Sequence, residues 1–393
     1  MEERPAGASC YRSFVFILWL NNFVGSTRAL ALSAQQVRRD DHHHHQKDRL
    51  PKVSRLVFGT LRLHETERPF ALLDEAWRLG IRAFDTARVY GNGESEKLLG
   101  EWLRGANDDG CGRSPRSQAT VITKGGCGAA SSFWRPNLCP DSLRRELETS
   151  LERLGKVDVY VLHRDEADRN VGEIVETMNQ FVEEGLVGAW GVSNWKATRL
   201  EAALRYAADS GLVPPRYSSL QDSLATPSRE PWPGTVYMDA AERRFYETHP
   251  EIAVLGWECL GKGFLAGRWA RGDRPDDHEC ADIYSDRWRE NRLKRAYLTE
   301  ANFDRRDRAT KLAHARGYGP EHVAIAWCLS RDYDSHVITA TVNPRHLRSN
   351  VRALSLDLTP DEARWLETGD GPPPKIVVDA PAAAAIETVA FAR

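Results

Sequence analysis

The sequence predicts an α/β fold, a (β/α)8 barrel of the TIM type, over residues 51–370. Short apolar segments alternate there with amphipathic ones, a pattern typical of parallel strands covered by helices. Eight such repeats in about 320 residues fit a closed barrel. A doubly wound open sheet is the alternative, because periodicity does not show closure. The Gly-x-Gly-x-x-Gly loop expected after the first strand of such a nucleotide-binding sheet is missing.

Four strands and the helices between them make up the first half of the predicted barrel. The first helix starts at Pro69, since proline suits a first helical turn, and Gly80 is its C-terminal cap. The helix after the third strand carries a leucine stripe and stops at Gly155. The expected strands are 57–58, 81–84, 121–123 and 157–162, and the expected helices lie around 69–79, 98–103, 143–154 and 175–182.

The second half repeats this alternation and adds two long insertions. The expected strands are 187–192, 217–220, 252–255 and 336–338, with helices through 200–204 and near 239–248, 305–316 and 344–353. A Pro/Trp-rich loop, 223–234, follows the sixth strand, and a stretch rich in acids and arginine, 268–305, follows the seventh. Loops at this end of a barrel carry specificity. We therefore expect the first insertion to form a pocket wall, with packing over the barrel rim as the alternative.

The two ends of the chain differ in composition from the barrel. Residues 1–50 hold an apolar run at 14–20 and small residues at 29–34, which indicates either a targeting peptide or a disordered extension. The run is shorter than the ~20 apolar residues that span a bilayer, so no membrane span is expected. The histidine run 42–45 reads as a solvated linker rather than a metal site, and residues 371–393 as an Ala/Pro-rich tail. The expected location is the cytoplasm, or an organelle if residues 1–34 are a targeting peptide.

Composition argues against several classes of function. The chain has 393 residues, 28% of them charged, and a formal net charge of −2. Its overall charge therefore gives no electrostatic attraction to nucleic acid or to an anionic membrane. Its seven cysteines are scattered and include no Cys-x-x-Cys pair, which argues against a disulfide framework and a structural zinc site. We expect a small-molecule substrate, no metal and a reducing compartment; the oligomeric state stays open.

Four polar residues stand at or just beyond the ends of three consecutive predicted strands. Asp85 follows the second strand, Lys124 the third and His163 the fourth, and Tyr90 comes from the loop behind Asp85. The C-terminal ends of barrel strands converge on one pocket. Each residue alone has a structural explanation, such as a turn cap for Asp85 or a packed loop aromatic for Tyr90. Their joint placement favours a functional site.

This set of side chains suits the reduction of a carbonyl group by a nicotinamide cofactor. Hydride delivery to carbon needs a proton for the developing alkoxide, and a free tyrosine, with a pKa of about 10, gives its proton up reluctantly. A nearby ammonium such as Lys124 stabilises the phenolate and is expected to lower the pKa of Tyr90. Asp85 would hold Lys124 charged and in place, and His163 would orient the carbonyl oxygen.

Five segments closely resemble the aldo-keto reductase superfamily, and the resemblance covers about residues 53–370. The segments are Phe84–Gly91, Gly93–Gly100, Ile122–Lys124, Leu162–Asp165 and Gly191–Trp195. The resemblance implies NAD(P)H-dependent reduction of an aldehyde or ketone to an alcohol. In this implied mechanism Tyr90 is the proton donor, assisted by Lys124, Asp85 and His163.

Two other functions stay open beside this one. A cofactor-binding regulatory protein with little turnover is the main alternative, as the β-subunits of potassium channels are in this superfamily. Non-redox chemistry on a barrel, such as that of a lyase, is the third option.

The resemblance also implies where the nicotinamide end of the cofactor binds. Ser193, Asn194 and Gln221 fall where the family hydrogen-bonds the carboxamide, and Trp257 falls where an aromatic side chain stacks on the ring. Gly59 and Thr60 match residues beside the ribose. The residues expected at this end of the cofactor are Gly59, Thr60, Asp85, Ser193, Asn194, Gln221 and Trp257.

The segments expected to hold the rest of the cofactor depart from the family pattern. Glu258–Leu260 replaces the common Ser-Pro-Leu near the pyrophosphate, and the segment 338–344 lacks an early basic residue for the 2′-phosphate. Arg345, His346 and Arg348 are expected to substitute, and arginine suits a phosphate because it pairs with it in a bidentate manner. The expected contacts here are Leu260, Thr341, Arg345, Arg348 and, at the adenine, Asn350. We expect NADPH, with NADH as the alternative.

Two further features complete the expected pocket. The inserted stretch 268–305 is expected to fold over the cofactor, with a charged surface excursion as the alternative. Trp134, in the loop after Lys124, is a further candidate for an aromatic pocket residue.

Overall fold

The structure, a computed structural model, describes residues 50–105, 118–127, 135–276 and 285–371. The chain divides into two units, residues 1–50 and 51–393, and of the first unit only Leu50 is described. The predicted N-terminal extension, the tail beyond Gly371 and the pocket candidate Trp134 therefore lie outside the described residues.

Eight parallel strands form a closed barrel in chain order. Each strand pairs with the next one, and Phe58 in the first strand pairs with Thr339 in the last. This closure confirms the predicted (β/α)8 barrel and excludes the open sheet. The strands are β1 (Leu56–Gly59), β2 (Ala83–Asp85), β3 (Thr120–Gly125), β4 (Val159–Leu162), β5 (Ala189–Ser193), β6 (Tyr217–Ser219), β7 (Ala253–Gly256) and β8 (Ser335–Thr339).

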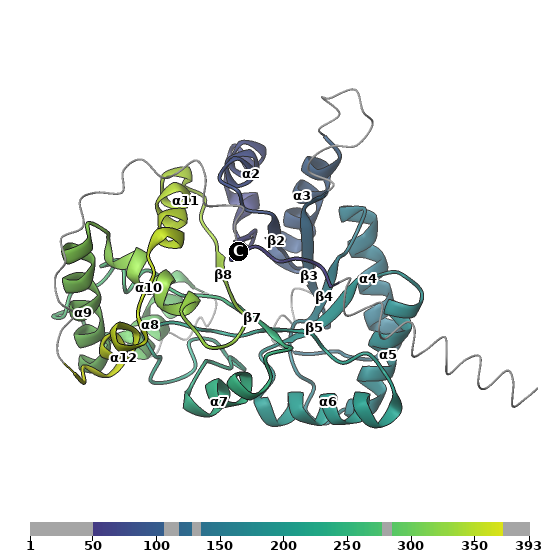
Figure 1. The fold of residues 1–393 in the computed structure, drawn as a ribbon. Helices are drawn as coiled ribbons and strands as arrows, with labels where there is room; N and C mark the ends of the chain where they lie inside the picture. Colours follow the sequence, from purple (N-terminus) through teal and green to yellow (C-terminus); the bar gives the residue numbers. More distant parts are fainter. Residues whose placement is uncertain (1–49, 106–117, 128–134, 277–284, 372–393) are drawn as a thin grey trace, which may run out of the picture. The chain divides into compact units, whose positions relative to one another are not determined.

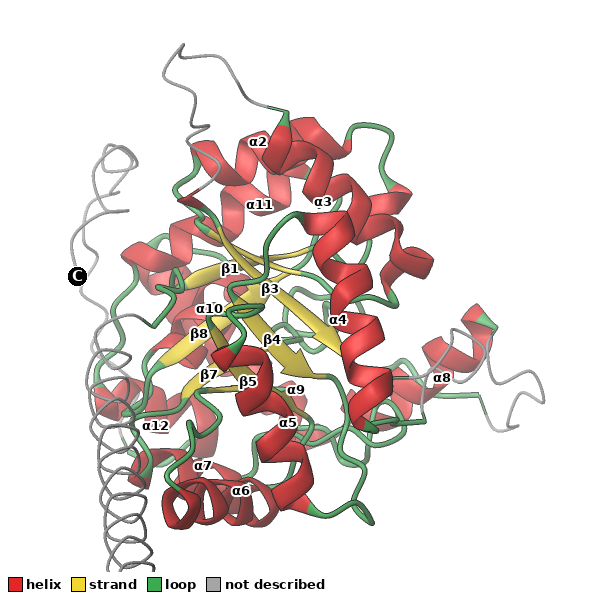
Figure 2. Cartoon of the chain, turned by 90° about the vertical axis from the view of Figure 1, so that its right-hand side faces the viewer, coloured by secondary structure: helices red, strands yellow, loops and turns green. Residues whose placement is uncertain are grey.

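Every residue of these strands is buried, which explains why they lack the regular apolar–polar alternation of a sheet with one exposed face. Figure 2 shows the strands gathered at the centre with the helices outside them. The barrel interior is therefore a packed core, and the polar chemistry is confined to the loops and strand ends.

Helices surround the strands (Figure 1). The helices are α2 (Pro69–Arg78), α3 (Glu94–Arg104), α4 (Pro140–Leu154), α5 (Val171–Glu183), α6 (Ala197–Ser210), α7 (Ala240–Thr248), α8 (Asp286–Tyr297), α9 (Glu300–Arg316), α10 (Pro320–Leu329), α11 (Pro344–Val351) and α12 (Pro360–Thr368). Those from α2 to α7 follow one another around the strands in chain order, whereas the last helix, α12, lies against α9 (Figure 1). Two of the described helices begin with proline in the first turn and end at a left-handed glycine: Pro140 and Gly155 bound α4, and Pro360 and Gly369 bound α12.

Three of these helices do not belong to the predicted set. In α10 every residue from His322 to Leu329 is buried, so it lacks the polar stripe by which an amphipathic helix is found. The helix α8 lies within the charged stretch 268–305, and α12 is a short helix that begins at a capping box formed by Thr359 and Glu362.

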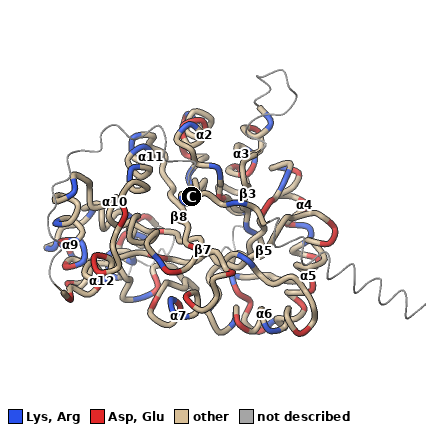
Figure 3. The backbone as a smooth tube through the Cα atoms, in the orientation of Figure 1, with Lys and Arg blue, Asp and Glu red and all other residues tan. Residues whose placement is uncertain are grey.

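Basic and acidic residues are mixed along the outer helices (Figure 3), in keeping with the formal net charge of −2. Within the described part of the chain, every helix is too short or too polar to serve as a membrane span.

Candidate active site

Three neighbouring strands carry the four predicted catalytic residues to one end of the barrel. Asp85 is the last residue of β2, Lys124 lies one residue before the end of β3, and His163 directly follows β4. Tyr90 begins the short 3-10 turn Tyr90–Gly93 that follows β2. The register pairs Asp85 with Ile122 of the neighbouring strand β3, so Lys124 lies two residues further along that strand.

The ammonium of Lys124 connects these residues. Its Nζ atom donates to the Asp85 carboxylate, to the Thr86 carbonyl at 3.0 Å and to the Tyr90 hydroxyl at 3.4 Å. The ring of His163 meets the ring of Tyr90 edge-on, with centroids 5.8 Å apart. The side chains of Asp85 and Lys124 are both 4% exposed, so a buried ion pair lies next to the phenol.

A glycine-containing turn presents Tyr90. Gly91 and Asn92 both adopt left-handed conformations, with φ of 56° and 55°. A Cβ atom on Gly91 would come within 2.6 Å of the His64 ring, so this position requires glycine for both conformation and space. The following helix is tied to β1 by Ser95, whose hydroxyl donates to the Thr60 carbonyl at 3.0 Å.

Burial and the ion pair act in opposite directions on Asp85 and Lys124. Burial raises the pKa of Asp85, and the Lys124 charge opposes that rise. Burial alone would lower the pKa of Lys124, but Asp85 and Tyr90 outweigh it and the pKa of the lysine is raised. Lys124 is therefore a cation at neutral pH.

The expected lowering of the Tyr90 pKa is wrong for this structure. Burial raises the pKa of Tyr90 above its ordinary value, and the opposing charges of Lys124 and Arg164 do not cancel that effect. Burial, together with Lys124, holds the pKa of His163 well below its ordinary value. At neutral pH the site thus holds a protonated phenol and a neutral imidazole.

A buried carboxylate next to this site, that of Glu96, is not among the residues predicted from the sequence. Glu96 of α3 is fully buried, and its carboxylate accepts from Thr123 Oγ1 at 2.6 Å and from Arg153 at 2.9 Å. Glu96 lies inside the segment Gly93–Gly100, where its helical spacing with Leu99 places it on the buried face. These bonds join α3, β3 and α4 next to Lys124, since Thr123 precedes it in β3.

Arg164 is a second residue near the site that has no role among those predicted from the sequence. It follows His163 directly, is buried, and donates to the Gly234 carbonyl at 2.6 Å. Its charge is one of those that oppose the rise in the pKa of Tyr90. Because Gly234 ends the Pro/Trp-rich loop 223–234, this bond joins that loop to the C-terminal end of β4.

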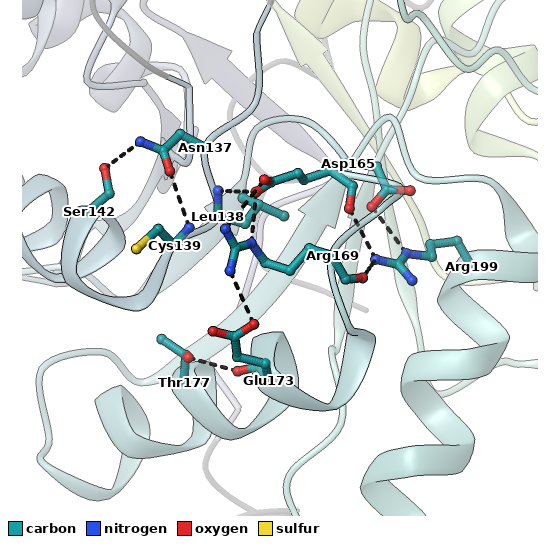
Figure 4. A network of polar contacts seen from close by, with 10 residues as sticks. Asn137, Leu138, Cys139, Ser142, Asp165, Arg169, Glu173, Thr177 and Arg199 are labelled. Atoms are coloured by element: carbon teal, nitrogen blue, oxygen red, sulfur yellow. Dashed lines mark hydrogen bonds and ion pairs between the residues drawn. The ribbon is translucent and has the colours of Figure 1, made fainter.

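A polar network holds the loop that carries His163 and Arg164 (Figure 4). Arg199 of α6 pairs with Asp165 at 3.2 Å and donates to the Arg169 carbonyl at 2.7 Å. Glu166 in turn pairs with Arg169 at 2.8 Å and accepts from the backbone N–H of Leu138 at 2.7 Å. The loop is thereby joined to α6 and to the segment before α4.

The residues predicted near the nicotinamide lie at the same end of the barrel. Ser193 ends β5, and the next residue, Asn194, adopts a left-handed φ of 58° and donates to the Ser193 hydroxyl at 2.9 Å. Gln221, just beyond β6, is buried and forms a bridge with Trp257, just beyond β7.

On the other side, Gly59 ends β1 and Thr60 donates its backbone N–H to the Asp85 carbonyl at 2.8 Å. The predicted nicotinamide contacts and the predicted catalytic residues therefore share one barrel end.

The residues predicted at the far end of the cofactor are less closely grouped. Asn350 donates to Thr339, the last residue of β8, at 2.6 Å. Arg348 pairs with Glu75 of α2 at 2.5 Å, whereas Arg345 is exposed in the first turn of α11. Leu260 and Thr341 lie in the loops after β7 and β8. Arg345 is thus the arginine better placed to meet an anion at the helix N-terminus.

The two insertions meet each other beside the site. The Trp232 indole donates to Glu258 at 3.0 Å, and its ring lies 6.4 Å from that of Trp288 in α8. A cavity of about 510 Å³ is lined by residues of both insertions, Trp232 and Arg268 among them, together with Lys262.

Comparison with known proteins assigns the family. The sequence model of the aldo/keto reductase family matches residues 55–368. Versiconal hemiacetal acetate reductase from Aspergillus parasiticus is 26% identical over 344 residues, which cover 80% of this chain and 93% of that protein. A Schizosaccharomyces pombe protein named as a voltage-gated potassium channel subunit beta is 27% identical over 310 residues, covering 76% of this chain and 83% of that protein.

Solved structures show the same fold. An aldo-keto reductase from Bacillus halodurans in its holo form has a TM-score of 0.60 at 20% identity, covering 80% of this chain and 91% of that one. An aldo/keto reductase from Klebsiella pneumoniae, in complex with NADP and acetate, has a TM-score of 0.56 at 21% identity. The match covers 82% of this chain and 93% of that one. The fold agrees with the sequence match, and the chain belongs to the aldo/keto reductase family.

Proposed function

We propose that this chain is an NAD(P)H-dependent oxidoreductase that reduces an aldehyde or ketone to an alcohol, with Tyr90 as the proton donor. Membership of the family supports carbonyl oxidoreduction in general. The observation that carries the finer assignment is the buried Lys124 ammonium, which contacts both the Asp85 carboxylate and the Tyr90 hydroxyl. A cation in that place stabilises a phenolate as the proton leaves.

The protonation states suit reduction. Because burial raises the pKa of Tyr90, the hydroxyl carries its proton at neutral pH and can give it to a developing alkoxide. His163 is neutral there because its pKa is held low, so it can orient a carbonyl oxygen by a hydrogen bond without adding a second charge. Asp85 keeps Lys124 charged and in place.

The donor set at the neighbouring strand ends fits a nicotinamide. The Ser193 hydroxyl and the amides of Asn194 and Gln221 supply the donors and acceptors that a carboxamide needs, and all three side chains are buried. Trp257 would cover the ring. When bound, the nicotinamide supplies the hydride. The exposed Arg345 at the start of α11 favours NADPH through its 2′-phosphate.

A second candidate function is a cofactor-binding regulatory protein with little turnover. The similarity to the Schizosaccharomyces pombe channel subunit favours it. The two functions share a cofactor site and differ in turnover, so one experiment separates them.

The test is a fluorescence titration of the chain with NADPH and NADH, followed by turnover of a panel of small aldehydes. Carbonyl reduction predicts binding of NADPH more tightly than NADH and steady oxidation of NADPH with aldehyde. Tight binding without turnover would favour the regulatory function. If neither cofactor bound, both would fail and the lyase alternative would lead.

A further inference from the structure

Gln221 is the first member of a buried hydrogen-bonded chain that leads away from the predicted nicotinamide site. Its amide Nε2 donates to the Tyr297 hydroxyl at 3.3 Å, and that hydroxyl donates to Glu258 Oε2 at 3.2 Å. The other oxygen of Glu258 accepts from Trp232 Nε1 at 3.0 Å and from Lys262 Nζ at 2.8 Å. Gln221 and Tyr297 are fully buried, and the Glu258 side chain is 7% exposed.

The carboxylate sets the direction of every bond in this chain. An ammonium and an indole N–H can only donate, and an ionised carboxylate can only accept. The single proton of the Tyr297 hydroxyl is therefore committed to Glu258, which leaves its oxygen as an acceptor. Only the NH2 end of the Gln221 amide can meet that acceptor, whereas an unrestrained amide can present either end. The Oε1 atom of Gln221 is thus the end left to accept.

The surrounding structure keeps this arrangement in place. Burial and the Glu258 carboxylate hold the pKa of Tyr297 well above its ordinary value, so the hydroxyl keeps its proton across the neutral range. Glu258 itself adopts a left-handed φ of 57°, which is uncommon for a residue with a side chain and persists where the surroundings hold it. Here three donors from separate segments hold it.

We propose that Tyr297, oriented by Glu258, is a positioning residue that fixes the amide of Gln221 so that it offers an acceptor to the carboxamide NH2 of a nicotinamide. The inference rests on the proposed function, and it gives the charged insertion between β7 and α9 a role in recognising the cofactor. A carboxamide would be favoured over a 3-acetyl group, which has no NH2 to donate.

The experiment compares the affinity for NADP⁺ with the affinity for its 3-acetylpyridine analogue, using tryptophan-fluorescence quenching. The ratio of the two dissociation constants cancels effects common to both cofactors, such as a change of charge near the phosphates. The variants are Tyr297→Phe, which removes the hydroxyl, and Glu258→Gln, whose amide can donate as well as accept. Tyr246→Phe is the matched control. It also removes a buried tyrosine hydroxyl, but that hydroxyl bonds to Ser218 at 2.7 Å rather than to Gln221.

We expect the wild-type chain to prefer NADP⁺ by about five-fold, the value of one hydrogen bond of ordinary net strength. The preference should fall toward unity in Tyr297→Phe and in Glu258→Gln, and stay at the wild-type value in Tyr246→Phe. An unchanged preference in Tyr297→Phe overturns the inference, and Glu258→Gln decides in the same way if Tyr297→Phe does not fold. A wild-type chain that binds neither cofactor refutes the proposed function, and the inference with it.

Discussion

At the scale of single residues, Lys124 and Asp85 form a buried ion pair to which we also assign a chemical role. Each charge is buried and each is the other's main partner. Removing one partner of a buried pair leaves the other uncompensated, whereas removing both charges costs much less. Stability and activity therefore respond differently to single and double substitutions.

Lys124→Met should lower the free energy of unfolding by about 3 kcal/mol, because Asp85 is left buried without its cation. It should also lower the rate of aldehyde reduction at least about 100-fold, because the phenolate loses its stabilising charge. Adding Asp85→Asn should recover most of the stability and none of the activity. Urea unfolding and NADPH oxidation measure the two effects; a single variant as stable as wild type would contradict the buried-pair argument.

His163 makes the stability of the fold depend on pH. Its pKa in the folded chain is far below the value of about 6.5 expected when unfolded. Below that pH the unfolded chain binds a proton that the folded chain refuses, so the free energy of unfolding falls as the pH falls. This contribution reaches about 1.4 kcal/mol per pH unit.

Between pH 7 and pH 5, the wild-type chain should therefore lose more unfolding free energy than His163→Asn, which lacks the titrating group. Denaturant titrations at a series of pH values measure the difference. Parallel pH profiles of the two proteins would show that His163 titrates alike in both states.

Among the helices and loops, the loop after β4 depends on Arg199 from α6. That guanidinium makes three contacts with the loop, to Asp165 and to the carbonyls of Glu166 and Arg169. Arg205 on the same helix pairs only with Glu201 at the surface among the described residues, where ion pairs contribute little. The two arginines form a matched comparison on one element.

Arg199→Ala should lower the free energy of unfolding by about 1–3 kcal/mol and kcat/KM by about ten- to a hundred-fold, since small displacements of a catalytic loop are costly. Arg205→Ala should leave both unchanged. Thermal unfolding measures the stability and steady-state kinetics measure kcat/KM. Equal kinetics in the two variants would mean that the position of His163 does not depend on this network.

Sequence patterns predict some elements well and others poorly, for identifiable reasons. The strand β3 contains the apolar pair Val121 and Ile122 shortly before Lys124, so both the strand and the lysine could be found. The helix α10 could not, because its periodicity vanishes when every side is buried. The bond between Gln221 and Tyr297 joins residues 76 positions apart, and no local pattern connects them.

The direction in which the Tyr90 pKa shifts does not follow from the sequence, for a related reason. The sequence shows that a lysine lies nearby, but it does not show how deeply both groups are buried. Burial turned out to be the larger effect.

For the whole molecule, the bonds that close the barrel indicate which part of the chain is needed for folding. Residues just before β1 are bound to distant segments, since the Pro51 carbonyl accepts from Tyr217 at 2.8 Å and the Lys52 carbonyl from Thr120 at 2.7 Å. The Arg55 carbonyl also accepts from Val337 of β8 at 2.9 Å. The barrel is therefore proposed to begin near residue 51 and to end near residue 370.

A truncated protein of residues 51–371 should fold and bind NADPH with the affinity of the full chain. One of residues 56–371 should unfold at a clearly lower temperature, because the bonds from Pro51, Lys52 and Arg55 are gone. Calorimetry and fluorescence titration test both. Failure of the 51–371 protein to fold would show that the barrel needs segments beyond it.

The central claim is that Tyr90 delivers the proton during carbonyl reduction by a bound nicotinamide. Its most direct test is single-turnover oxidation of pre-bound NADPH by an aldehyde, in wild type and in Tyr90→Phe. The claim predicts NADPH dissociation constants within about two-fold of each other, because no cofactor contact is removed, and a rate at least about 100-fold lower in the variant. Equal rates in the two proteins would contradict it.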